Sequence, residues 1–302
     1  MKKLLAAIML MTTATVWARA YEDGMAALAA KDYATAVEKL TIAAEEGDVS
    51  AQVILGHMHN TGLGVAQDYA KAVRWYEAAA EQGDAALQFD IGYMFANAQG
   101  VPKDYAKAVR WFKAAAEQGH AAAQFNLGVM YVAGRFVAQD YADAVRWFKL
   151  SAEQGLAPAQ FNLGTMFANA QGVPKNYAEA VRWYELAAEQ GLAPAQFNLG
   201  RMYDTGRGLP QDYAKAVRWY KAAAEQGDAD AQRFLGLMYA DGKGVLQDYT
   251  RAHMWWNLSG AQGQTRAKEL RDALAGVMTP KQITEAQKLA RECLAKNYKN
   301  CD

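Results

Sequence analysis

A repeat of 36 residues constrains this chain more than any other feature of its sequence. The clearest copy is the segment D-Y-A-K-A-V-R-W-Y-K-A-A-A-E-Q-G, whose tyrosine and closing glycine recur without insertions. The tyrosines are Tyr33, Tyr69, Tyr105, Tyr141, Tyr177, Tyr213 and Tyr249. Repeats of about 20 to 50 residues are typical of solenoids, in which a repeat buries its apolar face only against its neighbours. The sequence therefore predicts an all-α superhelix whose function lies on a repetitive surface.

Each copy of this segment is predicted to form one helix, with a residue that favours helix capping at each end. An Asp or Asn precedes the tyrosine, where its side chain can accept an unpaired amide of the first turn. The closing glycine stands where a left-handed cap ends a helix. Between these ends, Ala72, Trp75 and Ala79 share one helical face. A second helix, such as residues 195–203, comes first in each repeat, and a glycine-containing turn joins the two.

The chain is predicted to have four parts. Residues 1–20 combine Lys2 and Lys3, an apolar run and an A-x-A motif, as a signal peptide does, and the run is shorter than the roughly 20 residues that span a membrane. We expect a mature chain that begins at Tyr21 and does not insert into a membrane. The other parts are an N-terminal helical cap (21–47), six repeats (48–263) and a C-terminal helical cap (264–302).

The overall charge argues against a nucleic-acid partner. Removal of residues 1–20 leaves 29 basic and 32 acidic side chains, spread along the helices. Such a balance gives neither a basic patch for nucleic acid nor a polybasic arm for a membrane surface. We expect a monomer that binds proteins or peptides.

The C-terminal cap carries the only two cysteines, Cys293 and Cys301. In an exported protein such a pair favours a disulfide. Eight residues along one helix would separate them by about 12 Å, which is too far for a disulfide. The last helix should therefore begin after Thr279 and end near Lys296, so that residues 297–300 fold back. Another helix is expected at residues 266–277.

Three motifs resemble the Sel1-like repeat, a relative of the tetratricopeptide repeat: A-x-A-Q-x-N-L-G-x-M-Y, G-x-G-V-x-Q-D-Y and A-V-R-W-Y-x-x-A-A-E-Q-G. The resemblance covers residues 32–263 and implies a solenoid of helix pairs. Three positions depart from the pattern, since Ala98, Ala170 and Phe136 replace turn glycines. We expect the backbone of these three turns to differ from that of the others.

No catalytic, cofactor or metal site is predicted. The G-x-G turns lack the strand and the third glycine of a dinucleotide site, the four histidines have no ligand spacing, and no serine lies in a catalytic motif. One tryptophan per repeat could suggest a ligand-stacking ladder, but core packing between repeats is the favoured interpretation. The tryptophans are Trp75, Trp111, Trp147, Trp183, Trp219 and Trp255.

The first helix of each repeat offers the best candidate binding surface. The resemblance implies that this helix lines the concave groove, where an asparagine contacts a bound peptide. The candidate groove residues are Phe89, Phe125, Asn126, Phe161, Asn162, Phe197, Asn198 and Arg201. One position varies against an otherwise constant repeat, as His57, Tyr93, Val129, Thr165, Arg201 and Leu237. The alternative, that the phenylalanines pack between adjacent repeats, remains open at this point.

These observations favour an exported adaptor in the bacterial cell envelope, periplasmic or alternatively secreted. The alternative function is a cell-wall-related or β-lactam-hydrolysing enzyme, or a modulator of one. Relatives linked to β-lactams carry a cysteine pair inside each repeat, and this chain does not.

Overall fold

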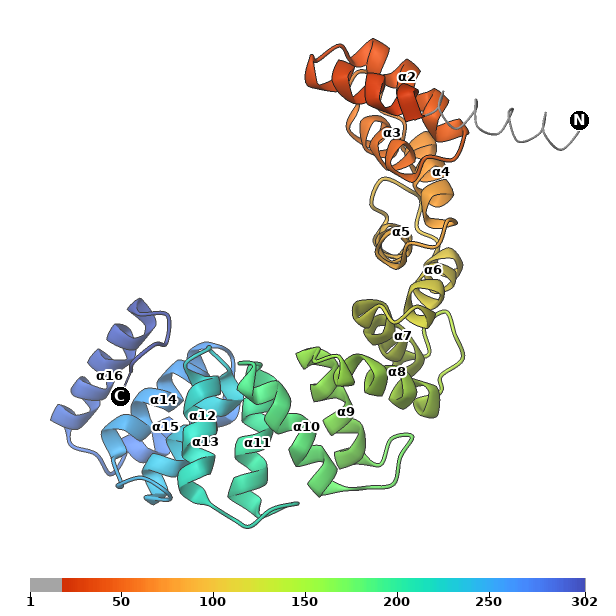
Figure 1. Ribbon diagram of the computed structural model, residues 1–302. Coiled ribbons are helices and arrows are strands. Elements are labelled where there is room, and N and C mark those ends of the chain that lie inside the picture. The colour runs from red at the N-terminus through yellow and green to blue at the C-terminus, as the bar shows by residue number, and fades with distance from the viewer. Residues whose placement is uncertain (1–17, 302) are drawn as a thin grey trace, which may run out of the picture. The chain divides into compact units, whose positions relative to one another are not determined.

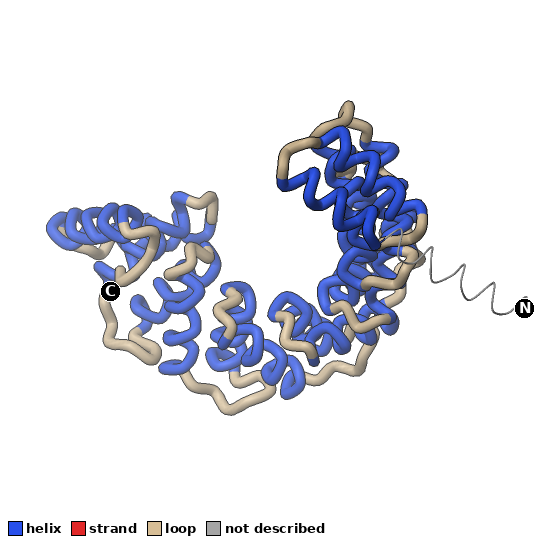
Figure 2. Tube along the Cα trace, turned by 45° about the horizontal axis from the view of Figure 1, so that its top comes forward, coloured by secondary structure: helices blue, strands red, loops and turns tan. Residues whose placement is uncertain are grey.

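The computed structural model describes residues 18–301, which form helices and turns and contain no strand (Figure 2). Neighbouring helices pack in pairs inside each of the two units described below, as the predicted solenoid requires. The chain divides into two compact units, Met1–Gln139 and Asp140–Asp302. We call them the N-terminal unit and the C-terminal unit and describe each by itself.

In the N-terminal unit a helix at residues 18–29 precedes six further helices (Figure 1). These are α2 (Tyr33–Glu45), α3 (Val49–Thr61), α4 (Tyr69–Ala80), α5 (Ala85–Asn97), α6 (Tyr105–Glu117) and α7 (Ala121–Ala133). Each packs against the next from α2 to α7. The predicted signal peptide lies outside the described residues except for residues 18–20, so the expected cleavage point falls within the first described helix.

The C-terminal unit continues the alternation and adds the two cap helices. Its helices are α8 (Tyr141–Glu153), α9 (Ala157–Asn169), α10 (Tyr177–Glu189), α11 (Ala193–Thr205), α12 (Tyr213–Ala224), α13 (Ala229–Asp241), α14 (Tyr249–Ala261), α15 (Thr265–Ala275) and α16 (Pro280–Ala295). Both α15 and α16 pack against α14, so the cap covers the end of the helix array.

The predicted helix caps are present. The Asp68 side chain accepts the Lys71 amide at 3.0 Å, and Asp104, Asn176 and Asp212 cap their helices in the same way. The closing glycines are all left-handed, with φ between 87° at Gly227 and 101° at Gly83. The tyrosine-led helices therefore begin and end where the sequence predicted.

The expectation about the three unusual turns is wrong. Ala98 and Ala170 adopt left-handed φ values of 55° and 58°, in the same region as the 76° of Gly62. Phe136 has a φ of 67° where the equivalent Gly64 has 74°. The backbone hydrogen bonds explain this, since the amide after each cap donates to the first helix in all of them, as Gln99 does to the Met94 carbonyl. The turn therefore keeps the same backbone conformation, and the Cβ atom of the residue lies too close to the following carbonyl oxygen.

Small and aromatic residues build the core between helices. Ala51, Leu55 and Met58 of α3 are buried, as are their equivalents in most other repeats. Trp111, Trp147, Trp183 and Trp255 are buried, whereas Trp75 and Trp219 are half-buried against neighbouring core clusters. The tryptophans are thus core residues, as predicted.

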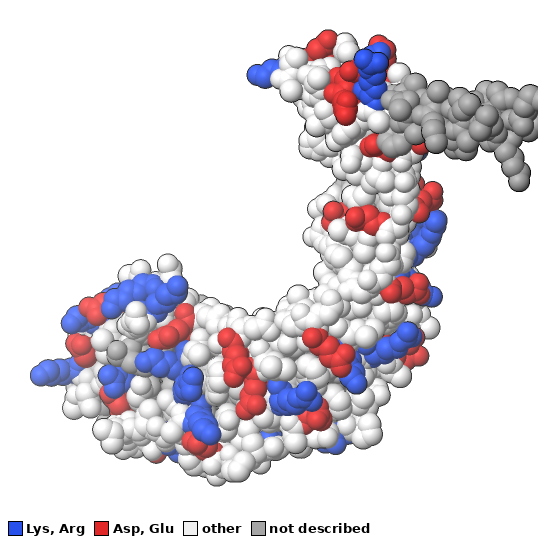
Figure 3. Space-filling view, in the orientation of Figure 1, with Lys and Arg blue, Asp and Glu red and all other residues white. Residues whose placement is uncertain are grey.

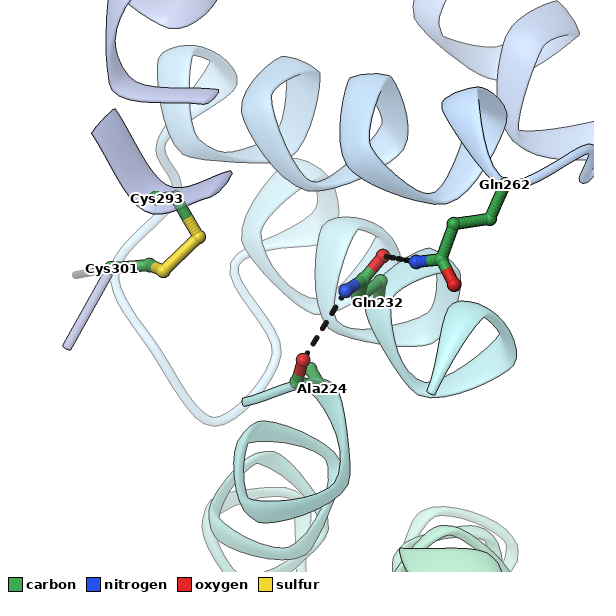
Figure 4. Close-up of a disulfide and its surroundings, with 5 residues drawn as sticks. All are labelled: Ala224, Gln232, Gln262, Cys293 and Cys301. Atoms are coloured by element: carbon green, nitrogen blue, oxygen red, sulfur yellow. Dashed lines mark hydrogen bonds between the residues drawn. A yellow bond between two sulfur atoms is a disulfide. The ribbon is translucent and has the colours of Figure 1, made fainter. Parts of the chain in front are cut away.

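A ladder of buried glutamines, which the sequence analysis did not anticipate, joins successive repeats. Gln232 donates to the Ala224 carbonyl at 3.2 Å, and Gln262 donates to the Gln232 side-chain oxygen at 2.9 Å (Figure 4). The same pair of bonds recurs at Gln88 and Gln196. Each buried amide is therefore satisfied on both sides, as a buried polar group requires.

The C-terminal cap contains the predicted disulfide. Thr279 and Gln282 form a capping box at the start of α16, which ends at Ala295. Asn297 and Tyr298 are left-handed and turn the chain back, and Cys293 and Cys301 are disulfide-bonded with their Cα atoms 4.9 Å apart (Figure 4). Only α15 differs from expectation, since it ends at Ala275, where Gly276 caps it.

Candidate binding pockets

The candidate phenylalanines of the first helices are half-buried. Three of them pack on an aromatic ring of the next helix, at 5.6 Å for Phe89 and Phe112, 5.8 Å for Phe161 and Tyr184, and 5.9 Å for Phe197 and Tyr220. Phe197 contacts Phe234 of the following repeat at 5.5 Å. These contacts are the ones expected if the phenylalanines pack against neighbouring helices and repeats. The phenylalanines therefore support the surface more than they line an open groove.

A glycine in the first helix lets these rings approach the helix backbone closely. A Cβ added at Gly92 would lie 2.8 Å from the ring of Phe112, and one at Gly164 would lie 2.9 Å from the ring of Tyr184. A larger residue would push the ring away from the first helix. These two glycines thus let the aromatic rings of Phe112 and Tyr184 lie where they line a pocket between neighbouring helices.

The N-terminal unit holds one such pocket between α5, α6 and α7, with a volume of about 340 Å³. We call it the aromatic pocket. Its lining residues are Tyr93, Ala96, Asn97, Lys103, Tyr105, Phe112, Asn126, Val129, Met130, Ala133, Arg135 and Phe136. The rings of Tyr105 and Phe136 stack with their centroids 3.4 Å apart, and the Lys103 ammonium lies 4.7 Å from the Tyr105 ring.

The C-terminal unit holds a corresponding pocket of about 270 Å³ between α9, α10 and α11. We call it the polar pocket. Its lining residues are Thr165, Ala168, Asn169, Tyr177, Tyr184, Asn198, Arg201, Met202, Thr205 and Arg207. Every one of them occupies a position equivalent to a lining residue of the aromatic pocket, two repeats later.

A hydrogen-bonded group lies in the polar pocket. The Tyr184 and Thr165 hydroxyls are 3.1 Å apart. Burial raises the pKa of Tyr184, and its hydrogen bonds with Thr165 and Asn198 and the charge of Arg201 offset part of this rise. The lining contains no acid, and neither Arg201 nor Arg207 forms an ion pair with any residue that the structure describes. The polar pocket therefore presents donors and positive charge.

A third pocket occurs one repeat before the aromatic pocket. It has a volume of about 560 Å³ and is lined by Asn60, Thr61, Gln67, Tyr69, Tyr76, Met94, Gln99 and Gly100. None of these side chains is charged. The pocket is thus a recurrent product of the repeat, and its chemistry changes from one repeat to the next.

The structure brings some of the predicted residues into these pockets. Asn198 and Arg201 meet in the polar pocket, and Asn126 lines the aromatic pocket. Phe89, Phe125, Phe161, Asn162 and Phe197 line none of the three.

Sequence reasoning missed the contribution of the turn. Arg135, Phe136 and Arg207 come from the turn after a first helix and were not candidates. The available signal was Phe136, which departs from the glycine of the repeat's own pattern.

The described residues were also compared with what a metal site or a membrane span requires. Over residues 18–301, no group of three or more His, Cys, Asp or Glu side chains is placed to hold a metal ion. None of the described helices has both the length and the apolar character needed to cross a bilayer. On the face shown in Figure 3, basic and acidic side chains are interspersed over each unit.

Comparisons with known proteins give a consistent result. The profile of the Sel1 repeat matches residues 49–84, 85–120, 121–156, 157–192, 193–228 and 229–264. No curated protein was found to match the chain.

Two solved structures are similar at both the sequence and the fold level. One is a protective antigen of uropathogenic Escherichia coli, with 36% identity, a TM-score of 0.72, and coverage of 88% of this chain and 57% of the antigen. The other is a Sel1 repeat protein from Oxalobacter formigenes, with 38% identity, a TM-score of 0.63, and coverage of 80% and 69%. The chain thus spans less than two thirds of the length of the antigen.

Proposed function

The chain belongs to the Sel1 repeat family, and we propose that it is a non-catalytic adaptor whose pockets receive an extended segment of another protein in the bacterial cell envelope. Sel1 repeat proteins are in general scaffolds for protein interactions. The observation that carries the proposal is the recurrence of one pocket, with an asparagine at the same place, in the two units.

The shared asparagines suit the backbone of a bound segment. The amide of Asn126 or Asn198 can both donate and accept a hydrogen bond, as an extended peptide backbone requires. Beside these two asparagines, the pockets differ at Val129 and Arg201, which line the aromatic and the polar pocket. A shared group for the backbone next to a different group for the side chain is the arrangement that a sequence-selective binder needs.

The cell-envelope location rests on two features of the chain. Residues 1–20 have the composition of a signal peptide. The disulfide between Cys293 and Cys301 is a bond that persists in oxidising compartments. We propose the periplasm as the site of action, with secretion as the alternative.

Site-specific photo-cross-linking in the native host tests the proposal. A benzophenone amino acid replaces Val129 or Arg201 in the pockets, and Leu150 or Leu186 as exposed controls on the tyrosine-led helices α8 and α10. We expect a protein adduct from the two pocket positions and little from the controls. Adducts from the controls alone would contradict the proposal.

Substitution of the amides supplies the second readout. The variant Asn126→Ala, Asn162→Ala, Asn198→Ala should lose the pocket adducts and keep its helicity. Loss of one amide contact costs on the order of 1 to 3 kcal/mol of binding free energy. Undiminished adducts in a well-folded triple variant would mean that these amides do not hold the bound segment.

A further inference from the structure

Phe136 is strained and exposed at a place where the fold needs no side chain. The equivalent turn position is a left-handed glycine in five other repeats, at Gly64, Gly100, Gly172, Gly208 and Gly244. Phe136 adopts the same conformation with a φ of 67°, which disfavours any residue with a Cβ. Its side chain is 50% exposed. Residues with backbone strain of this kind cluster at functional sites.

The ring of Phe136 builds one wall of the aromatic pocket. It stacks on Tyr105 with the planes 13° apart. Tyr93 and Val129, which are 44% and 40% exposed, also line the pocket. Three apolar side chains that remain exposed around one cavity form a surface that water solvates poorly and that an apolar group can cover.

The size and shape of the cavity favour a single large side chain. A volume of about 340 Å³ is near the lower end of the range of small-molecule sites. Aromatic walls prefer an aromatic guest, because offset and edge-to-face ring contacts add to the gain from burial. The lining therefore favours an aromatic side chain as the anchor.

The charges around the cavity indicate what lies beside that anchor. Lys103 and Arg135 line the pocket, no acidic residue lines it, and neither cation forms an ion pair with a described residue. A carboxylate next to the anchor would supply the missing partner, and charge complementarity of this kind fixes orientation and register. Asn126 also lines the pocket, where its amide can hydrogen-bond with the backbone between the aromatic anchor and the carboxylate.

We propose that the aromatic pocket is the anchor site for an extended protein segment in which an aromatic side chain lies next to a carboxylate. This inference rests on the proposed function and specifies what the N-terminal unit recognises. The polar pocket does not share this preference, because Gly208 stands where Phe136 stands and Arg201 where Val129 stands.

A blocked peptide, acetyl-Gly-Ser-Phe-Glu-Ser-Gly-amide, serves as the probe. It is titrated into the ¹⁵N-labelled full chain, and the amide shifts of residues 133–137 and 205–209 are followed by NMR. We expect saturable shifts in the first segment only. Replacing Phe by Ala in the peptide should weaken binding about tenfold, and replacing Glu by Gln about threefold. No saturable shift at residues 133–137, or equal shifts in both segments, would overturn the inference.

Two variants test the assignment to individual side chains. Phe136→Gly restores the residue of the other repeats, so it should fold, and it should weaken binding about tenfold. The double variant Lys103→Gln, Arg135→Gln should abolish the preference for the Glu peptide over the Gln peptide. Arg207→Gln, a change in the polar pocket, should keep that preference. Full affinity in Phe136→Gly, or a preference retained in the variant Lys103→Gln, Arg135→Gln, would refute the inference.

The cross-linking experiment separates this inference from the proposed function. Adducts at Val129 and Arg201 together with no binding of the probe would reject the aromatic anchor and keep the scaffold role. Absence of adducts together with no binding would reject both.

Discussion

The aromatic pocket and the polar pocket share a frame and differ in chemistry. The shared residues are Ala96 and Ala168, Asn97 and Asn169, Tyr105 and Tyr177, Asn126 and Asn198, Met130 and Met202, and Arg135 and Arg207. The exchanged residues are Tyr93 and Thr165, Phe112 and Tyr184, Val129 and Arg201, Ala133 and Thr205, and Phe136 and Gly208. Every exchange removes a ring or an apolar group from the second pocket or adds a hydroxyl or a charge to it.

The comparison shows how a repeat protein can change its recognition without changing its fold. The shared residues lie on the paired helices and on the turn, and they include the asparagine of each pocket. Apart from Phe112 and Tyr184, which are buried, the exchanged residues are exposed or half-buried. The two pockets therefore present different side chains on similar backbones, which is what selective binding under the proposed function requires.

The largest expected effect is the removal of a tryptophan under either pocket. Trp111 and Trp183 are buried on α6 and α10, the helices that carry the pocket rings. Replacing either by Ala leaves a cavity and should cost about 3 to 5 kcal/mol of unfolding free energy. Urea titration followed by circular dichroism measures this loss, and hydrogen exchange assigns it to a unit. A similar cost in both units is expected because the frame is shared.

The controls for this prediction are Arg110→Ala and Arg182→Ala. Each guanidinium lies on the exposed side of its tryptophan, 5.0 Å and 5.2 Å from the ring. Their removal should cost at most about 1 kcal/mol. If one tryptophan variant were as mild as its arginine control, the two frames would not be equivalent.

The next effect distinguishes the units, because only the C-terminal unit carries the disulfide in the described chain. The variant Cys293→Ser, Cys301→Ser should lose about 2 to 3 kcal/mol, since the crosslink restricts the unfolded chain. Hydrogen exchange should show the loss in α14, α15 and α16 and leave the N-terminal unit unchanged. Dithiothreitol should reproduce the effect in the native chain and have none on the variant. Equal loosening of α2 to α7 would contradict a staple that acts locally.

The buried glutamine ladder should contribute comparably in the two units. Gln88 donates to the Ala80 carbonyl at 3.0 Å, and Gln196 donates to the Ala188 carbonyl at 3.1 Å. Replacement of either by Leu fills the site with an apolar side chain of similar size but leaves a buried carbonyl unpaired, at a cost of about 1 to 3 kcal/mol. Thermal unfolding of the two variants measures it. An unchanged midpoint would mean that water replaces the amide.

The sequence was sufficient to predict the features that are local and periodic. The helix caps at Asp68 and its equivalents, the capping box at Thr279 and the disulfide of Cys293 follow from short-range rules, and the structure has each of them. The family resemblance supplied the pairing of helices, which periodicity alone leaves undefined.

What the sequence could not supply is contact across repeats. Gln88 and Gln118 lie 30 residues apart and meet through their side chains, so no local rule points to the ladder. For the pockets, attention to the first helices found Asn126, Asn198 and Arg201, but the turn residues are added only when two repeats are placed together. Half-burial of Phe89 and Phe161 likewise depends on rings contributed by the following helix.

The smallest expected effect concerns the turns, where sequence reasoning was wrong. Ala98 and Ala170 follow the pocket residues Asn97 and Asn169, and both are exposed with left-handed backbones. Replacing either by Gly removes a Cβ that costs about 1 to 2 kcal/mol in this conformation. The greater freedom of Gly in the unfolded chain takes back about 0.4 to 1 kcal/mol.

The expected net result is a stabilisation of about 0.5 kcal/mol or slightly more at each site, which is a rise of about 1 to 2 °C in Tm. The matched controls are Ala106→Gly and Ala178→Gly, which are exposed within the helices α6 and α10. There the same substitution should destabilise by up to about 1 kcal/mol, because the Cβ is unstrained and only the entropy term acts. Differential scanning calorimetry of the four variants should therefore give opposite signs for turn and helix. A lower Tm for Ala98→Gly and Ala170→Gly would mean that these alanines are not strained, and the argument that Phe136 is retained against strain would lose its basis.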